Sequence, residues 1–165
     1  MSNESDVMDA HARAIGYLSW AWADLHRHLG NLFSAIMRGG MDDVALAAWN
    51  AVRSDSELRR MLRAAAEAQF RTDALLKKEI DWLVNTIDRA SIKRNKIIHG
   101  QFSLLFSDSD IVVIQNPDTD EVNSTITEKI DKTTRYLESL SGFAAQLFPC
   151  VVESSHRPLP QRPHL

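Results

Sequence analysis

The fold follows chiefly from residues 72–100, which read TDALLKKEIDWLVNTIDRASIKRNKIIHG. Within this stretch large apolar residues recur at steps of three and four, the period of an amphipathic α-helix; they include Leu76, Ile80, Leu83, Ile87 and Ile98. Thr72 and Asp73 are residue types that cap helix starts, and Gly100 is one that ends helices. We therefore expect one long helix between these signals.

The same period extends toward the N-terminus. It predicts a helix over residues 7–38, closed by Gly39 and Gly40. A second helix is expected to start at Asp42 and a third to follow the cap residues 54–57, although the two could also be one broken helix.

Beyond Gly100 the pattern changes to short β-like runs at 102–106 and 111–114, which predict a hairpin. A last helix is expected to open at Ser124 or Thr125 and to end at Pro149. Together these elements predict an all-α fold, an antiparallel bundle of four to five helices with a short β-hairpin before the last helix.

The chain has the composition of one globular domain, with 165 residues, 44% of them hydrophobic and 25% charged. We place the helical domain at residues 8–150. The polar segment 1–7 and the proline-rich tail 151–165 are expected to be disordered.

Several classes of protein are disfavoured. A formal net charge of −3 does not suit a protein that coats nucleic acid by bulk attraction. Cys150 is the single cysteine, so no internal disulfide is possible, and no cysteine and histidine cluster predicts a metal or cofactor site. Since neither a signal pattern nor a membrane-spanning run is present, we expect a soluble cytoplasmic protein with no membrane partner.

The chemistry concentrates in residues 94–100, RNKIIHG, at the end of the long helix. Arg94 and His99 would lie about 7.5 Å apart along the axis and about 140° apart around it, a separation that a long arginine can span. Asn95 precedes His99 by one turn, where its amide could orient the imidazole. A histidine can give or take a proton near neutral pH.

Cleavage of RNA needs a group that removes the 2′-hydroxyl proton, a group that protonates the leaving oxygen, and positive charge at the phosphate. One histidine and one arginine supply half of this set. Two copies related by a twofold axis would supply all of it around one phosphate, because such an interface brings the same patch together twice. This hypothesis predicts a homodimer that acts on RNA.

An arginine and a histidine five residues apart form a weak motif when taken alone. The longer string RNKIIHG, at the end of a long helix and before a break, resembles the HEPN superfamily (higher eukaryotes and prokaryotes nucleotide-binding domains). The hallmark of that family is R-x4-6-H, commonly with a polar residue directly after the arginine, as Asn95 is here. The resemblance covers residues 8–148 in helical layout, is specific only in the motif, and is closest to an uncharacterised bacterial subgroup.

The resemblance implies a helical bundle and, in many members, a metal-independent endoribonuclease acting as a toxin or in antiviral defence. Carried over to this sequence, it implies that Arg94 and His99 are catalytic, with Asn95 in support and Asp24 reaching the same face. It also allows a cognate antitoxin or regulatory protein. Some members carry a tyrosine two residues after the histidine that a partner enzyme adenylylates; Gln101 stands there, so that route of control is not expected.

Two other interpretations remain open: a non-catalytic HEPN module that binds a nucleotide or a partner protein, and a structural bundle in which Arg94 and His99 pair with acidic neighbours. Residues 57–96 hold ten Lys or Arg against six Asp or Glu. This surplus, with Lys93 and Lys96 in it, could be an RNA track or a solvated face.

Some side chains are expected to serve the fold. Asp24 and His28, one turn apart, are more simply a local contact than a metal pair. Helical spacing among apolar neighbours predicts core packing for the tryptophans, namely Trp20, Trp22, Trp49 and Trp82.

Overall fold

The computed structural model describes residues 4–106, 111–115, 126–153 and 157–164. In this part of the chain five helices and one antiparallel hairpin follow one another: α1 Glu4–Arg38, α2 Asp43–Ala51, α3 Asp55–Gln69, α4 Ala74–His99, β1 Phe102–Phe106, β2 Ile111–Gln115 and α5 Ile126–Val152. The predicted all-α bundle with a hairpin before the last helix is confirmed, and the two expected helices after Gly40 are separate.

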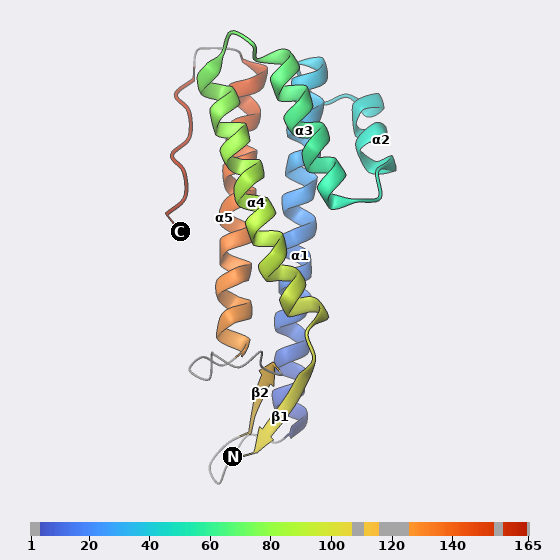
Figure 1. The fold of residues 1–165 in the computed structure, drawn as a ribbon, viewed down its shortest axis with the longest axis vertical. Helices are drawn as coiled ribbons and strands as arrows, with labels where there is room; N and C mark the ends of the chain where they lie inside the picture. The colour runs from blue at the N-terminus through green and yellow to red at the C-terminus, as the bar shows by residue number, and fades with distance from the viewer. Residues whose placement is uncertain (1–3, 107–110, 116–125, 154–156, 165) are drawn as a thin grey trace.

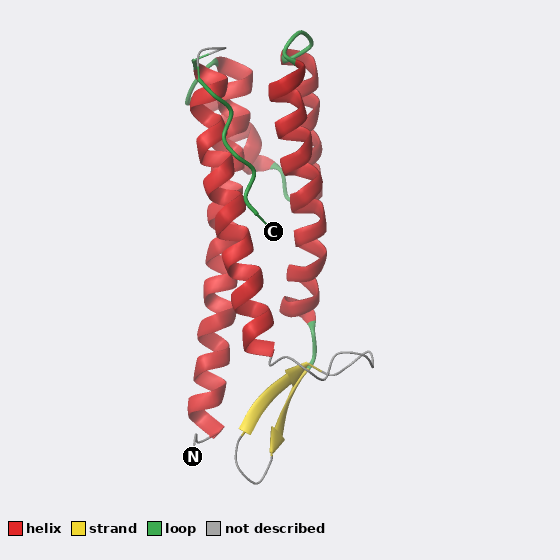
Figure 2. Ribbon diagram, turned by 90° about the vertical axis from the view of Figure 1, so that its left-hand side faces the viewer, coloured by secondary structure: helices red, strands yellow, loops and turns green. Residues whose placement is uncertain are grey.

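Consecutive helices run in opposite directions, so α4 descends beside the ascending α3 and α5 (Figure 1). The short α2 lies on the outside, against α1. Figure 2 shows the hairpin extending past the ends of α4 and α5, alongside the first turns of α1. Residues after α4 therefore leave the bundle at the same end as the N-terminus.

The core is a continuous apolar cluster contributed by all five helices and β2. Helix α1 presents a stripe of fully buried leucines to it, and α4 presents Ile80, Leu83 and Ile87. Burying a side chain of this size contributes about 1.5–3 kcal/mol. The three- and four-residue spacing read from the sequence thus identifies the faces that meet in the bundle.

Capping residues fix where the helices begin. The Asp73 carboxylate accepts a hydrogen bond from the Leu76 backbone N–H at 3.0 Å, and Asp42 accepts one from Ala45 at 2.9 Å. These bonds satisfy N–H groups that have no partner within their own helix. Helix α4 ends at His99, after which Gly100 has an extended backbone. The predicted limits of α4 are confirmed.

Helix α5 differs from the prediction at its C-terminal end. It continues through Pro149 to Val152, and the Pro149 carbonyl accepts from the Glu153 N–H at 2.9 Å. Proline removes one helical hydrogen bond, but so close to the end of the helix that loss does not stop it. The expected start at Ser124 or Thr125 lies outside the described residues.

Trp20 is also placed differently from the prediction of a core residue, with 77% of its surface exposed. It follows the fully buried Leu18 by two residues, and two residues turn the side chain by about 200° around a helix. Apolar neighbours in the sequence therefore did not imply an inward direction. Trp22 and Trp49 are buried and Trp82 is half-buried against the core, as expected.

Parts of both terminal segments, for which disorder was expected, have described positions in the structure. Helix α1 already includes residues 4–7. In the tail, which lies along the bundle in Figure 2, Arg162 donates to both oxygens of Glu79 at 2.7 and 2.9 Å, and its guanidinium lies 4.9 Å from the centre of the Trp82 ring. Such a paired contact is stronger than a single neutral hydrogen bond. Because its partners are 83 residues apart, local composition could not predict it.

Among the helices that the structure describes, none combines the length and the apolar character that crossing a membrane requires.

Close packing between α1 and α2 generates a test of the fold. A Cβ at Gly30 would lie 2.9 Å from Cδ1 of Trp49, whereas one at Gly16 would meet nothing within 4 Å. We expect Gly30→Ala to lower the free energy of unfolding by about 1–3 kcal/mol through overpacking. The control Gly16→Ala should raise it by about 0.5–1 kcal/mol through helix propensity. Urea denaturation measures both, and equal effects would contradict the described packing.

Candidate functional site

Arg94 and His99 both lie near the end of α4 that adjoins the hairpin, but in different environments. Arg94 follows the fully buried Ile87 by seven residues, so it occupies the core-facing register of the helix. It is half-buried there, and its guanidinium lies 5.5 Å from the centre of the Trp22 ring on α1. His99, the last residue of α4, is exposed.

The Arg94 guanidinium is held on two sides. The Trp22 ring supports it at a distance typical of a cation–π contact, and Nη1 donates to the Asn95 amide oxygen at 3.0 Å. Its Nε is buried without a hydrogen-bond partner. Arg94 therefore has a restricted position and a spare donor.

Asn95 and His99 do not make the contact expected of them. The Asn95 oxygen accepts from Arg94, and the structure shows no hydrogen bond or ion pair of His99 with any residue it describes. Asn95 thus contacts the arginine rather than orienting the imidazole.

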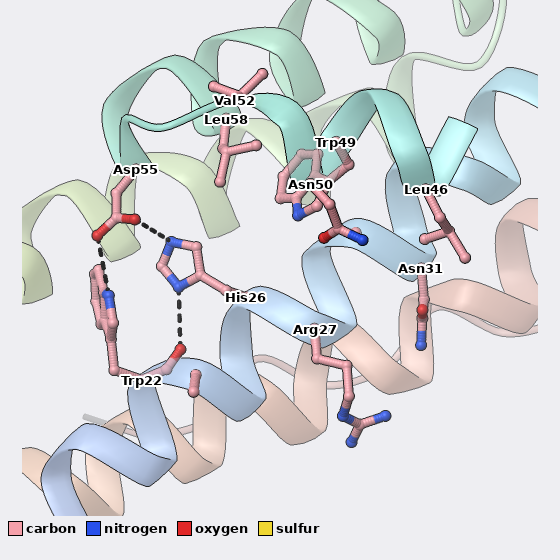
Figure 3. A pocket seen from close by; sticks show the side chains of 12 residues that line it. Trp22, His26, Arg27, Asn31, Leu46, Trp49, Asn50, Val52, Asp55 and Leu58 are labelled. Atoms are coloured by element: carbon pink, nitrogen blue, oxygen red, sulfur yellow. Dashed lines mark hydrogen bonds and ion pairs between the residues drawn. The ribbon is translucent and has the colours of Figure 1, made fainter. Parts of the chain in front are cut away.

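Trp22 is itself fixed by α3 (Figure 3). Its Nε1 donates to Oδ2 of Asp55 at 3.0 Å, and Oδ1 of Asp55 lies 3.6 Å from Nε2 of His26. Nδ1 of His26 lies 3.0 Å from the Trp22 carbonyl oxygen. Because a carbonyl oxygen only accepts, Nδ1 must carry a proton. This network joins α1 to the start of α3 through Trp22, the residue whose ring contacts Arg94.

The environment of His26 disfavours its charged form. Burial lowers the pKa of His26 and outweighs the hydrogen bond to the Trp22 carbonyl and the Asp55 charge, which raise it. The positive charges of Arg59 and Arg94 lower this pKa further. Because the pKa is lowered from a value already below 7, we infer a ring that is neutral at neutral pH.

Some of the basic side chains in residues 57–96 make contacts between α3 and α4. Arg59, only 5% exposed, donates from Nε to Asp88 on α4 at 2.6 Å, and Arg63 donates to Asn85 at 2.7 Å. Such residues do not form a free RNA track. Lys93 and Lys96 are exposed.

The structure places Asp24 on the α5 side of α1 and not beside Arg94. One oxygen of Asp24 accepts from Ser141 at 2.6 Å and the other from Arg27 at 2.6 Å, and His28 lies 3.4 Å away. The hydrogen bond from Ser141, followed by that from Arg27, lowers the pKa of Asp24. Asp24 follows Trp22 by two residues, which turn its side chain by about 200° around α1. Trp22 faces Arg94, so Asp24 faces the other side of α1, where Ser141 of α5 lies.

An open groove of about 540 Å³ lies between α1, α2 and α3. Trp22, His26 and Asp55 line one end, while Trp49 and Asn50 line the other (Figure 3). The sequence could not reveal this groove, because its residues come from three helices and form no motif. Within the described ranges, no group of three or more His, Cys, Asp or Glu residues could hold a metal ion.

Comparisons of the chain with protein-family models, with curated proteins and with solved structures found no match.

The depressed pKa of His26 predicts a pH dependence of stability. Near pH 6.5 the unfolded histidine takes up a proton that the folded ring resists, so the free energy of unfolding should fall as the pH drops from 8 to 5. We expect His26→Gln to make this fall shallower, but not to abolish it, because burial also lowers the pKa of His11.

Denaturation at a series of pH values measures the slope. His164→Gln, at an exposed position in the tail, serves as the matched control and should keep the wild-type slope. A His26→Gln slope equal to that of the wild type would contradict the assignment of a neutral buried ring.

Proposed function

We propose that the chain is a HEPN-type, metal-independent endoribonuclease that acts as a homodimer. The observation that carries the proposal is that one end of α4 holds both an exposed His99 and an Arg94 whose guanidinium contacts Trp22 and Asn95. This arrangement agrees with the motif RNKIIHG, and the proposed reaction requires no metal.

Arg94 suits the role of a phosphate-binding cation. A guanidinium keeps its charge at all physiological pH values and can donate to two phosphate oxygens at once. Since Trp22 and Asn95 already restrict its position, less reorganisation is needed as charge develops on the phosphate. The unpartnered Nε adds a donor that a small movement could direct to an oxygen.

His99 suits the transfer of protons because solvent and substrate can reach it. In the proposed step, His99 of one copy removes the proton from the 2′-hydroxyl, and the 2′-oxygen forms a bond to phosphorus. The bond from phosphorus to the 5′-oxygen breaks, and His99 of the second copy protonates that oxygen. The products are a 2′,3′-cyclic phosphate and a 5′-hydroxyl.

The site is incomplete in one copy, because one imidazole cannot serve as base and acid in the same step. A twofold interface beside the end of α4 would bring both copies of Arg94 and His99 to one phosphate. Gln101, exposed just after α4, stands where some family toxins carry the modified tyrosine. We therefore propose that any control by an antitoxin or regulatory protein acts through binding, in a toxin or defence role.

A second function is favoured by one observation. His99 has no orienting partner in the described part of the chain, whereas Arg94 has two contacts. A non-catalytic module that binds a nucleotide or a partner protein through Arg94 would need only the arginine.

The deciding experiment is cleavage of a mixed RNA in EDTA by the wild type, His99→Ala and Arg94→Ala. We expect cyclic phosphate ends from the wild type, a loss of about 10²–10⁴-fold in His99→Ala and of about 10²–10³-fold in Arg94→Ala. Matched controls are His164→Ala and Arg135→Ala, both at exposed positions outside the segment 94–100. Equal activity in all five proteins would show a contaminant, and binding of RNA without cleavage would favour the second function.

The dimer has a separate test. If two copies build the site, the rate per chain should rise with protein concentration and level off where sedimentation shows a dimer. A rate per chain that stays constant across the transition from monomer to dimer would contradict the two-copy site.

A further inference from the structure

The groove between α1, α2 and α3 contains an indole N–H, that of Trp49, for which the described part of the chain supplies no acceptor. Trp49 is only 4% exposed, and its ring packs against Phe33 with centroids 5.4 Å apart. In the described ranges no acceptor pairs with its indole N–H, and the nitrogen is not enclosed, since Trp49 lines the groove. Tryptophan N–H groups usually have a partner, and because this one opens on the groove, a ligand or water can supply it here.

Two amides accompany this indole. Asn31 on α1 and Asn50 on α2 line the same end of the groove as Trp49 (Figure 3). Neither side chain has a hydrogen-bond partner in the part of the chain that the structure describes. An amide offers both a donor and an acceptor, so this end can bind a ligand edge that is rich in acceptors.

The opposite end of the groove can only accept. The Asp55 side chain is 49% exposed, and the hydrogen bond from Trp22 uses one of its two oxygens. A carboxylate has about four lone-pair positions, so Asp55 can still accept two hydrogen bonds from a ligand. The groove therefore presents donors at one end and an acceptor pair at the other.

The geometry points to a binding site for the guanine base of single-stranded RNA in this groove. Guanine carries two adjacent donors, N1–H and the N2 amino group, which match the two oxygens of a carboxylate. Its O6 and N7 are acceptors that match the indole and the amides. Adenine, cytosine and uracil lack two adjacent donor groups on one edge. The volume of about 540 Å³ lies within the usual range of ligand sites.

The position of the groove relates this base site to the phosphate. Trp22 forms part of the groove wall and also supports the Arg94 guanidinium. A base in the groove would thus lie one aromatic side chain away from the cation assigned to phosphate. The inference rests on the proposed function in this respect, and it adds a preference for cleavage next to guanosine.

The test is titration with guanosine 5′-monophosphate, followed by the ¹H–¹⁵N signal of the Trp49 indole, which Trp49→Phe assigns. We expect saturable movement of this signal and binding about tenfold tighter than that of the adenosine and cytidine monophosphates, a ratio expected for an unmatched hydrogen-bonding edge. Asp55→Asn should remove the preference because one acceptor becomes a donor. The control Asp131→Asn, at an exposed position on α5, should keep it.

Asn31→Ala gives a second, independent variant, which should weaken all three nucleotides. The inference is overturned if guanosine monophosphate leaves the Trp49 signal in place, if the three nucleotides bind equally, or if folded Asp55→Asn keeps the preference. Since this measurement needs no cleavage, it separates the two proposals. Guanine binding without ribonuclease activity would reject only the enzyme, and cleavage without guanine binding would reject only the base site.

Discussion

The hydrogen bond from the Trp22 indole to Asp55, 3.0 Å long, lies where three helices meet. It joins the longest helix, α1, to the first residue of α3, while the face of the same indole supports Arg94 of α4. Trp22 is only 7% exposed, so burial of its ring stabilises the bundle, and its polar edge and its face determine where charged groups lie. Through this residue the arrangement of α3 becomes coupled to the position of the proposed phosphate-binding cation.

Most of the fold could be predicted from the sequence because it depends on local signals. Apolar spacing, Asp42, Asp73 and Gly100 fix the helices and their limits, and each acts within a few residues. The structure differs from the prediction where a contact between distant segments determines the conformation. Arg162 contacts Glu79 and Trp82 from the tail, and Trp20 lies outside because α1 has only one buried face in that part of its length.

The candidate site was predictable in composition but not in contacts. A motif on one helix places Arg94 and His99 near each other, yet Asn95 has two possible partners within reach, and only packing selects Arg94. The position of Asp24 could not be predicted for the same reason. Its side chain meets α5 and not α4, and the sequence around Asp24 does not show which helix packs against it. No local sequence pattern predicts the groove between α1, α2 and α3, because each helix contributes only some of its lining residues.

The register of Arg94 argues against a purely structural role for it. In a bundle that served only its own stability, the position seven residues after Ile87 would hold an apolar side chain, because an arginine there must be partly desolvated. Arg94 instead has a buried Nε without a hydrogen-bond partner, and among the residues that the structure describes its guanidinium contacts an amide oxygen and an indole face but no carboxylate. A positive charge that is positioned but not neutralised is what an anionic ligand requires. Trp49 is similar in one respect: its indole N–H opens on the groove that Trp22 also lines, and no residue in the described part of the chain accepts a hydrogen bond from it.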